Sequence, residues 1–452
     1  DFLSEIQNSN VKPIEPVFLD FKKDLSQLKA KSNIPVLYKQ NTSNDLFQLI
    51  YVFDMGNNND KVLGTAFDYI DYLGTSDMTP EQLKSEFYRL ACTFRVVPGN
   101  ERTYVLLSGL NENMPEAMKL FEKLMADAQV NKEAYTNMVA DILKSRKDAK
   151  LNQMQNFRRL MSYGMYGPKS PATNILTEAE LQNMDPQELI DRIHNQNSYQ
   201  HRILYYGPTS EKELLAIINK NHQAPKKLKE IPVGNEFPHL ETPVTQIFIA
   251  PYEAKQIYMT QLSNRGDKFD PMIEPSRQMY NEYFGGGMNS IVFQEMRESR
   301  GLAYSAWAGL NRPSYLKYPY MLQTQIATQN DKMIDAIKVF NDIINNMPES
   351  EAAFKLAKDG LTNRLRTERI IKGDIIWSYI NAQDLGQNVD PRIKLYNDIQ
   401  NMSLKDIVDF QKQWVKGRTY VYCILGDKKD LELDKLKAVG PIEELTQEQI
   451  FG

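Results

Sequence analysis

The most informative segment of the sequence is FGGGMNSIVFQEMRESRGLAYSAW, residues 284–307. Its three glycines end one helix-forming segment, and Asn289 or Ser290 is then a suitable N-cap for a second helix. Short polar side chains at an N-cap accept hydrogen bonds from helix N–H groups that have no partner inside the helix. Gly301 can take the left-handed conformation that commonly ends a helix, and LAYSAW follows as a strand. The stretch therefore predicts a helix, a tight turn and a strand.

Arg297 lies on the last predicted turn of this helix and Tyr304 lies just after the tight turn, so both side chains could face one space. A phosphate-binding loop does not fit, because GGGMNS lacks the following Lys-Ser/Thr and the G-x-x-x-x-G spacing. A structural role does fit, because the helix dipole favours an arginine near a helix C-terminus and a tyrosine packs readily in a sheet. Taken alone, the stretch favours the structural interpretation.

The segments on either side of this stretch contain an internal repeat. One copy begins LQNMDPQELIDRIHNQ and runs into the strand HRILYYG; the other begins IQNMSLKDIVDFQKQ and runs into TYVYCILG. Asn183 matches Asn401, 218 positions later, and Gly207 matches Gly426, 219 positions later. The repeat indicates duplication of a domain of about 200 residues, against the alternative of a chance match between common helix–strand–helix patterns.

The domain boundaries follow from composition. Residues 221–243 hold four prolines, a glycine and several charges without a sustained apolar period, which is typical of a linker. We predict a linker from an upstream segment at 1–17, a first α/β domain at 18–222, a linker at 223–239 and a second α/β domain at 240–452.

The expected fold class is α+β, with two homologous α/β domains in tandem, each a largely antiparallel or mixed sheet covered by helices. Apolar runs predict a pair of strands at 33–40 and 45–56 and further strands at 92–98, 102–110, 245–251, 256–266 and 316–328. Helical periodicity predicts one helix from about Lys61, one with Thr79 as its N-cap, and one at 114–128, followed by long helices that continue to about Tyr163. In the second unit it predicts helices at 271–286 and 331–347. The aromatic segment NRPSYLKYPYM, residues 311–321, could line a binding surface, because tyrosine offers an apolar face with a polar tip. The favoured interpretation is a strand entry packed on the core.

Composition excludes several classes of protein. The 452 residues carry 54 basic and 58 acidic side chains, and a net charge of −4 argues against a dedicated nucleic-acid binder. No apolar run approaches the length of about 18 residues that a membrane span needs. Cys92 and Cys423 are too few for a disulfide scaffold or thiolate metal cluster, and the four histidines form no H-E-x-x-H motif.

The segment 284–307 resembles the C-terminal-domain signature of the pitrilysin/insulinase-type zinc metallopeptidases, a family that includes processing peptidases. The resemblance rests on GGG at 285–287, FQEMRE from Phe293 and RGLAY from Arg300. The family's functional pair is an Arg and a Tyr seven positions apart, which implies Arg297 and Tyr304 as catalytic residues here. The family fold, two homologous α/β domains per half, agrees with the repeat.

The chain departs from the family at the metal motif. The frame G-x-A-H-F-L-E-H…G-T corresponds to GTAFDYIDYLGT, in which Phe67, Ile70 and Asp71 replace His, Glu and His, and the spacing before Gly74 differs by two residues. Phe67 and Ile70 can neither bind zinc nor act as a base, so these positions are degenerate and no metal is expected here. Asp68 and Asp71 could attract a hard cation, but a solvated helix face is the favoured interpretation.

The resemblance therefore implies the non-metal half of a zinc-dependent peptidase. No cofactor is expected in this chain, and zinc would come from a zinc-bearing partner half. That partner is either an upstream part of the same polypeptide, which the linker-like start favours, or a separate subunit. Peptides are the implied substrates, while neither nucleic acid nor a membrane span is expected. This chain alone should not hydrolyse peptides.

The alternative function is a catalytically inactive scaffold or a peptide-binding module of the same fold. The presence of both Arg297 and Tyr304 at the family's spacing favours the peptidase half, because a scaffold needs neither residue. The compartment stays open between cytoplasm and periplasm, and the missing leader slightly favours the periplasm.

Overall fold

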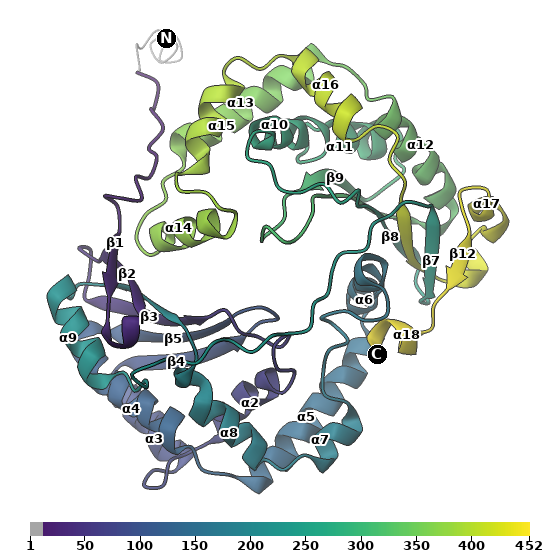
Figure 1. Cartoon of the computed structure of the whole chain (residues 1–452). Coiled ribbons are helices and arrows are strands. Elements are labelled where there is room, and N and C mark those ends of the chain that lie inside the picture. Colours follow the sequence, from purple (N-terminus) through teal and green to yellow (C-terminus); the bar gives the residue numbers. More distant parts are fainter. Residues whose placement is uncertain (1–11) are drawn as a thin grey trace, which may run out of the picture.

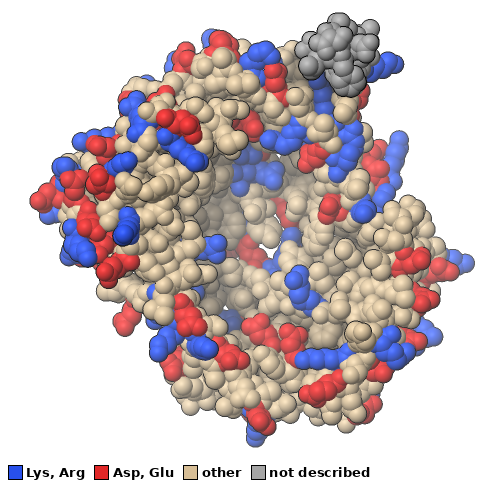
Figure 2. Space-filling view, turned by 180° about the vertical axis from the view of Figure 1, so that it is seen from behind, with Lys and Arg blue, Asp and Glu red and all other residues tan. Residues whose placement is uncertain are grey.

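The computed structural model describes residues 12–452, so most of the predicted linker at 1–17 lies outside the described residues. Two six-stranded sheets, each covered by helices, form an open ring with most helices on its outer side (Figure 1). Seen from behind, the molecular surface is hollowed at the centre of this ring (Figure 2).

The first sheet has the strand order β1-β2-β6-β3-β5-β4. Its strands are β1 (Ser26–Lys29), β2 (Pro35–Gln40), β3 (Leu46–Phe53), β4 (Cys92–Pro98), β5 (Thr103–Leu110) and β6 (Arg202–Gly207). β2 and β6 run parallel, and all other neighbours in this sheet are antiparallel. The two strands predicted as a pair, β2 and β3, are therefore not hydrogen-bonded to each other, because β6 lies between them.

The second sheet has the order β12-β7-β11-β8-β10-β9. Its strands are β7 (Gln246–Pro251), β8 (Gln256–Ser263), β9 (Ser305–Asn311), β10 (Met321–Gln329), β11 (Val421–Gly426) and β12 (Ile442–Glu444). Here β11 and β7 run parallel, as do β7 and β12, and the other neighbours are antiparallel.

Five strands of each sheet correspond one to one. The series β2-β6-β3-β5-β4 and β7-β11-β8-β10-β9 have the same chain order and the same directions, and the sheets differ in the sixth strand at one edge. The predicted fold class, two homologous α+β units with mixed sheets covered by helices, is confirmed. Strands β6 and β11 occupy equivalent positions in the two sheets. They contain the apolar segments at the end of the sequence repeat from which the duplication was predicted.

The helices that the sequence predicts lie close to their expected positions, and the structure adds others, among them α13 to α15 and α18. In the first unit they are α2 (Leu63–Tyr69), α3 (Pro80–Arg89), α4 (Met114–Asp127), α5 (Lys132–Leu151), α6 (Gln153–Tyr166), α7 (Glu178–Asn183), α8 (Gln187–Asn195) and α9 (Glu211–Asn221). In the second they are α10 (Glu274–Phe284), α11 (Ile291–Phe293), α12 (Met333–Asn345), α13 (Glu351–Thr367), α14 (Asp374–Asp384), α15 (Pro391–Ile399), α16 (Leu404–Trp414), α17 (Leu433–Lys437) and α18 (Gln447–Phe451). Thr79 caps α3 in a reciprocal capping box with Gln82. Within residues 12–452, none of these helices has both the length and the apolar character to cross a membrane.

Each sheet has one face covered by helices of its own unit and the other face covered by a helix from the opposite unit. Ile376 and Ile380 of α14, in the second unit, pack with Leu37 and Ile50 of the first sheet. Conversely, α6 of the first unit packs on the second sheet. Gly164 of α6 lies so close to this sheet that a Cβ atom added to Gly164 would meet the sulfur of Cys423. Burial of both faces accounts for the nearly continuous apolar sequences of β3 and β11.

The aromatic segment before β10 joins the two units. Tyr318 donates a hydrogen bond to Glu101 of the β4–β5 turn (2.7 Å), and the guanidinium of Arg102 lies 5.1 Å from the centre of the Tyr315 ring. The prediction that this segment packs on the core holds for the fully buried Tyr320 but is wrong for the other two tyrosines. Their phenol groups need polar partners, and the facing turn of the first unit provides them.

Candidate active-site surface

The signature segment forms a helix of mixed type followed by a sharp turn. α10 ends at Gly285, where a side chain would meet the backbone of Ala308. Ser290 caps α11 by accepting a hydrogen bond from the Phe293 N–H (3.3 Å). The chain then widens into a π-helix, η5 (Gln294–Ser299), which the sequence pattern did not predict, and Gly301 makes the turn with a φ of +56°. π-Helical turns often occur at functional sites.

The turn brings Arg297 and Tyr304 to the lining of one hollow of about 220 Å³. Arg297 extends from η5, with its guanidinium 5.1 Å from the centre of the Phe293 ring. Within residues 12–452 no hydrogen bond or ion pair joins this guanidinium to another group. Tyr304 begins the path into β9, where its N–H donates to the Ala327 carbonyl (2.8 Å) and its side chain is 53% exposed.

Two residues that sequence reasoning missed complete this hollow. Gln329, at the end of β10, donates a hydrogen bond from Nε2 to the Tyr304 hydroxyl oxygen (2.7 Å). Lys332 ends η6 (Asn330–Lys332) and donates from Nζ to the Gly301 carbonyl (3.1 Å). Neither carries a motif of its own, and both reach the hollow because β10 pairs with β9. A prediction of this pairing from the strand pattern is the signal that could have found them.

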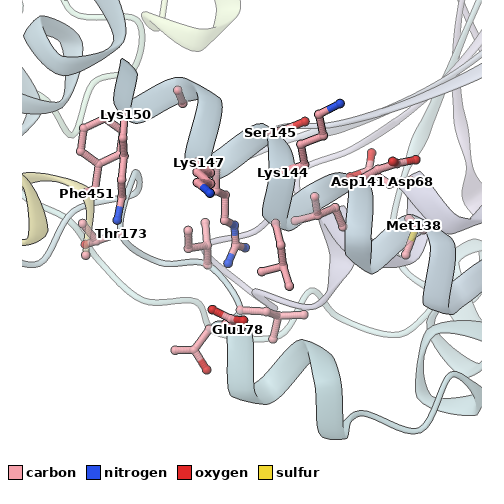
Figure 3. A pocket seen from close by; sticks show the side chains of 18 of the residues that line it. Asp68, Met138, Asp141, Lys144, Ser145, Lys147, Lys150, Thr173, Glu178 and Phe451 are labelled. Carbon is pink, nitrogen blue, oxygen red and sulfur yellow. The ribbon is translucent and has the colours of Figure 1, made fainter. Parts of the chain in front are cut away.

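The segment that the sequence analysis predicts to be a degenerate metal motif lies on α2 and the short helix η2 (Ile70–Tyr72). Phe67 and Ile70 are buried in the first core, whereas Asp68 and Asp71 are exposed and border a pocket of about 1170 Å³ (Figure 3). Although the two residues are exposed, partial desolvation of the carboxylates by the surrounding chain, and then the charge of Asp71, raise the pKa of Asp68. Partial desolvation likewise raises the pKa of Asp71, against the lowering effect of Lys84. In the described part of the chain no three His, Cys, Asp or Glu side chains are grouped so that they could hold a metal ion. The residues at this position do not fit zinc.

Two of the four histidines form a buried network in the first core. His201 and His222 are hydrogen-bonded through their Nε2 atoms (2.8 Å), and His222 Nδ1 lies 2.5 Å from Glu122 Oε1. Tyr51 donates to the same carboxylate (2.9 Å). Burial lowers the pKa of His201 to about 3. With its members bonded to one another, the network fills a structural role in the core.

Comparison with known proteins finds a family model and a curated relative that each match part of this chain. Residues 201–361, from β6 to α13, match the family model described as the Peptidase M16 inactive domain. A curated relative, the non-peptidase homolog YmxG of Helicobacter pylori, is 28% identical over 152 residues, which are 32% of this chain and 34% of that protein. The match thus spans about a third of the length of this relative.

Solved structures share the fold. The peptidase M16 inactive domain from Pseudomonas fluorescens aligns over 89% of this chain and 98% of its own with a TM-score of 0.67 and 15% identity. A protease from Helicobacter pylori aligns over 89% of this chain and 99% of its own, with a TM-score of 0.65 and 13% identity. The periplasmic protease PqqL from Escherichia coli aligns over 93% of this chain but 47% of its own, with a TM-score of 0.72 and 14% identity.

The matched segment and the fold fit the M16 peptidase family, and within it the half that holds no metal. M16 is the pitrilysin/insulinase-type family that the signature at 284–307 resembles, so this prediction is confirmed.

Proposed function

We propose that this chain is the non-metal half of a two-half M16 peptidase and that it supplies Arg297 and Tyr304 to a site whose zinc is held by the other half. One observation carries the proposal: an arginine without an ion-pair partner among the described residues and a tyrosine held by Gln329 line the same hollow. Zinc in the other half would supply Lewis-acid chemistry at the peptide carbonyl.

The Tyr304 hydroxyl is arranged to act as a hydrogen-bond donor. Because its oxygen already accepts the hydrogen bond from Gln329 (2.7 Å), its own proton is available for a second partner. Negative charge develops on the carbonyl oxygen of a peptide as its carbon is attacked. A donor fixed near that oxygen stabilises the transition state more than the ground state. The pairing of β9 with β10 holds the tyrosine in place.

The basic groups of the same hollow are arranged to hold the substrate. The guanidinium of Arg297 is planar and permanently charged, so it can bind a substrate carbonyl or carboxylate with two parallel hydrogen bonds. Lys332 borders the same space and adds a second positive charge. We infer that Arg297 acts in both substrate binding and turnover, and that Lys332 supports the field at the site.

The proposed partner is a zinc-bearing M16 half, present upstream in the same polypeptide or as a separate subunit. The length comparison supports this arrangement, since the chain aligns with 47% of PqqL and with nearly all of the Pseudomonas inactive domain. The substrates would be peptides enclosed between the two halves.

A second candidate function is a scaffold or peptide-binding module without catalysis. The description of YmxG as a non-peptidase homolog favours it. The two functions differ in what Tyr304 does, because a scaffold gains nothing from a hydroxyl at a 53% exposed position.

The test is the variant Tyr304→Phe in the complex with the zinc-bearing half, with Tyr88→Phe as the matched control. Tyr88 is 87% exposed and lies on α3, away from the hollow. Hydrolysis of a fluorogenic peptide should fall by about 10²-fold or more for Tyr304→Phe, the scale seen when one oxyanion donor is removed. The control should keep the parent rate. Equal rates for both variants would favour the scaffold.

A further inference from the structure

A pocket of about 690 Å³ lies on the first unit, where three neighbouring strands begin or end. β2 begins at Pro35, β6 begins at Arg202, and β3 ends at Phe53. Because β2 and β6 run parallel and β3 runs antiparallel to β6, these three points lie at the same end of the sheet. The candidate active-site hollow around Tyr304 shares no residue with this pocket, so the two sites are separate.

The segment that follows α9 forms one wall of the pocket. It passes the turn between β1 and β2 on its way to the second unit (Figure 1), and the Ser32 hydroxyl of that turn donates to the Pro225 carbonyl (2.6 Å). Lys229 forms backbone hydrogen bonds with Ser198 and Gln200 (2.8 and 2.9 Å), which hold the segment against the sheet. Four residues of the segment border the pocket: Lys226, Lys227, Leu228 and Ile231.

Positive groups outnumber negative groups around this pocket. Arg202, Lys226 and Lys227 border it, and Asp54 is the one acidic residue among its described lining residues. Both lysines are exposed, and within residues 12–452 neither forms an ion pair. His201 also borders the pocket but adds no charge near neutral pH, because burial lowers its pKa to about 3.

Asp54 does not neutralise these groups, because it is already bound to another arginine. It accepts a hydrogen bond from Arg102 Nε (2.6 Å), and Arg102 also forms a bidentate ion pair with Asp384. Arg202 Nη2 lies 3.7 Å from Asp54 Oδ1, which is beyond hydrogen-bond distance. Two arginines and two aspartates thus balance, and the two lysines leave an excess of two positive charges.

The guanidinium of Arg202 lacks hydrogen-bond partners. Its side chain is 19% exposed, and its buried Nε and Nη2 atoms have no hydrogen-bond acceptor among the described residues. A buried charged donor without an acceptor is unfavourable, and such groups commonly find their partner in a bound ion, ligand or water. An anionic ligand in the adjoining pocket is therefore favoured.

The excess of two positive charges favours a dianion. A phosphate monoester carries a charge of about −1.5 to −2 near pH 7 and three strong acceptor oxygens. Lysines bind phosphate as point charges, and the guanidinium of an arginine binds it through its fork of donors. A carboxylate or a sulfate ester carries a single negative charge and would leave one lysine unbalanced.

The volume and the rest of the lining favour a ligand larger than phosphate itself. A volume of about 690 Å³ lies within the range of roughly 300–1,000 Å³ that is usual for small-molecule pockets. Apolar side chains contribute part of the wall: Pro35, Val52, Leu228 and Ile231. Contact with this wall would favour a phosphate ester with an apolar or aromatic part over inorganic phosphate.

We propose that this pocket binds a small phosphate monoester. The phosphate group lies at Arg202, Lys226 and Lys227. The apolar or aromatic part of the ligand lies against Leu228 and Ile231. The site is independent of the proposed function, because it requires neither zinc nor a second half. Since most of these residues belong to the segment that joins the two units, the bound ligand would hold that segment against the first sheet.

The test is titration calorimetry of the purified chain at about pH 8, where a phosphate monoester is a dianion because its second pKa is about 6. The ligands are phenyl phosphate, phenyl sulfate, inorganic phosphate and phenol. Phenyl phosphate should bind, and each of the others should bind about tenfold more weakly or worse. Phenyl sulfate lacks the second charge, inorganic phosphate lacks the ring, and phenol lacks the charged group.

Three outcomes of this titration would contradict the proposal. No binding of phenyl phosphate, or equal binding of phenol, would overturn the site as a whole. Equal binding of phenyl sulfate would overturn the assignment to a dianion. Equal binding of inorganic phosphate would overturn the assignment of the apolar wall to the ligand.

A pair of double variants locates the site. Lys226→Gln combined with Lys227→Gln should weaken binding of phenyl phosphate by about tenfold or more, because two charge-assisted contacts are lost. Lys212→Gln combined with Lys220→Gln is the matched control, since these two lysines are exposed on α9 and do not border the pocket. Equal loss in both double variants would show a general attraction of anions to the chain and would overturn the site. The four ligands tested on the parent chain keep the proposal falsifiable if a variant fails to fold.

Discussion

For single residues, the proposed function depends on how the structure holds Arg297 and Tyr304. Tyr304 directly precedes β9 and Arg297 lies within the π-helix η5, so regular structure holds each residue on its side of Gly301. Both side chains are exposed, which leaves the guanidinium and the hydroxyl available to a substrate.

Arg297→Ala should weaken substrate binding and turnover together in the complex with the zinc-bearing half. The guanidinium can contact a substrate in the ground state and in the transition state, so its loss should raise KM and lower kcat. Steady-state kinetics with a fluorogenic peptide measures both constants. Arg300→Ala is the control, because Arg300 lies three positions away but does not border the hollow. An unchanged KM for Arg297→Ala would contradict the binding role.

His201 should make the stability of the chain depend on pH. Its pKa is about 3 in the folded state against 6.5 for the unperturbed group, so the unfolded chain takes up a proton that the folded chain does not. The contribution of His201 is fully present above pH 6.5 and is lost as pH falls toward about 3, by up to about 1.4 kcal/mol per pH unit.

Urea unfolding at pH 7 and pH 4.5 measures this effect. The fall in the free energy of unfolding between the two pH values should be smaller in His201→Gln than in the parent chain. His194→Gln is the control, since His194 lies on the exposed face of α8 and should leave the pH dependence unchanged. The same fall in all three proteins would show that His201 is not the group that titrates.

At the scale of elements, the exchange of helices between the units is the feature that stabilises the ring. α14 lies on the first sheet and α6 on the second, and Asp384 of α14 forms a bidentate ion pair with Arg102 (2.5 and 2.7 Å). Each unit therefore lacks part of its own core when the other is absent. We expect the two units to unfold together.

Ile380→Ala should destabilise the chain by about 2–5 kcal/mol, because Ile380 is fully buried between α14 and the first sheet and the substitution leaves a cavity. Urea unfolding followed by circular dichroism measures the change. Ile371→Ala, at a position 53% exposed just before α14, should have little effect. Separate transitions for the two sheets in either protein would contradict their coupling.

Gly285→Ala should disturb the signature segment, because its Cβ would meet the backbone of Ala308 in β9. A cost of about 1–3 kcal/mol is expected for overpacking at a site that cannot relax. Gly287→Ala is the matched control, since nothing lies within 4 Å of a Cβ at that position. Thermal unfolding compares the two, and equal melting temperatures would show that Gly285 is not required for packing.

Much of this element structure can be predicted from the sequence, for reasons that also explain the failures. Thr79 with Gln82 is a local signal, so α3 is found from its capping box alone. The insertion of β6 between β2 and β3 is not predictable from periodicity, because pairing joins residues 150 or more positions apart. Gln329 was missed for a different reason: it carries no motif and reaches Tyr304 only through the pairing of β10 with the neighbouring strand β9.

The covering helices could not be assigned from the pattern either. β3 and β11 are apolar on both faces, which predicts burial on both faces but not the helix that provides it. The position of Arg297 and Tyr304 was predictable because a glycine turn separates them by only seven residues, whereas the π-helix was not, since no simple periodicity marks it.

At the scale of the whole molecule, two homologous units face each other across a hollow and present one intact signature and one degenerate motif. In the first unit the positions of the metal motif are occupied by core residues, Phe67 and Ile70, and in the second the Arg–Tyr pair remains on the surface. Under the proposed function, a chain with this pair and without a metal site would use the pair only together with a second, zinc-bearing half.

The most direct measurement is peptide hydrolysis by the zinc-bearing half as this chain is added. The account predicts that each half alone is nearly inactive and that the rate rises by about 10²-fold or more and saturates at one chain per zinc-bearing half. The same titration with a chain carrying both Arg297→Ala and Tyr304→Phe should saturate at the same ratio without the rise in rate. A rate that does not change when the chain is added, or the same rise with the double variant, would contradict the central claim.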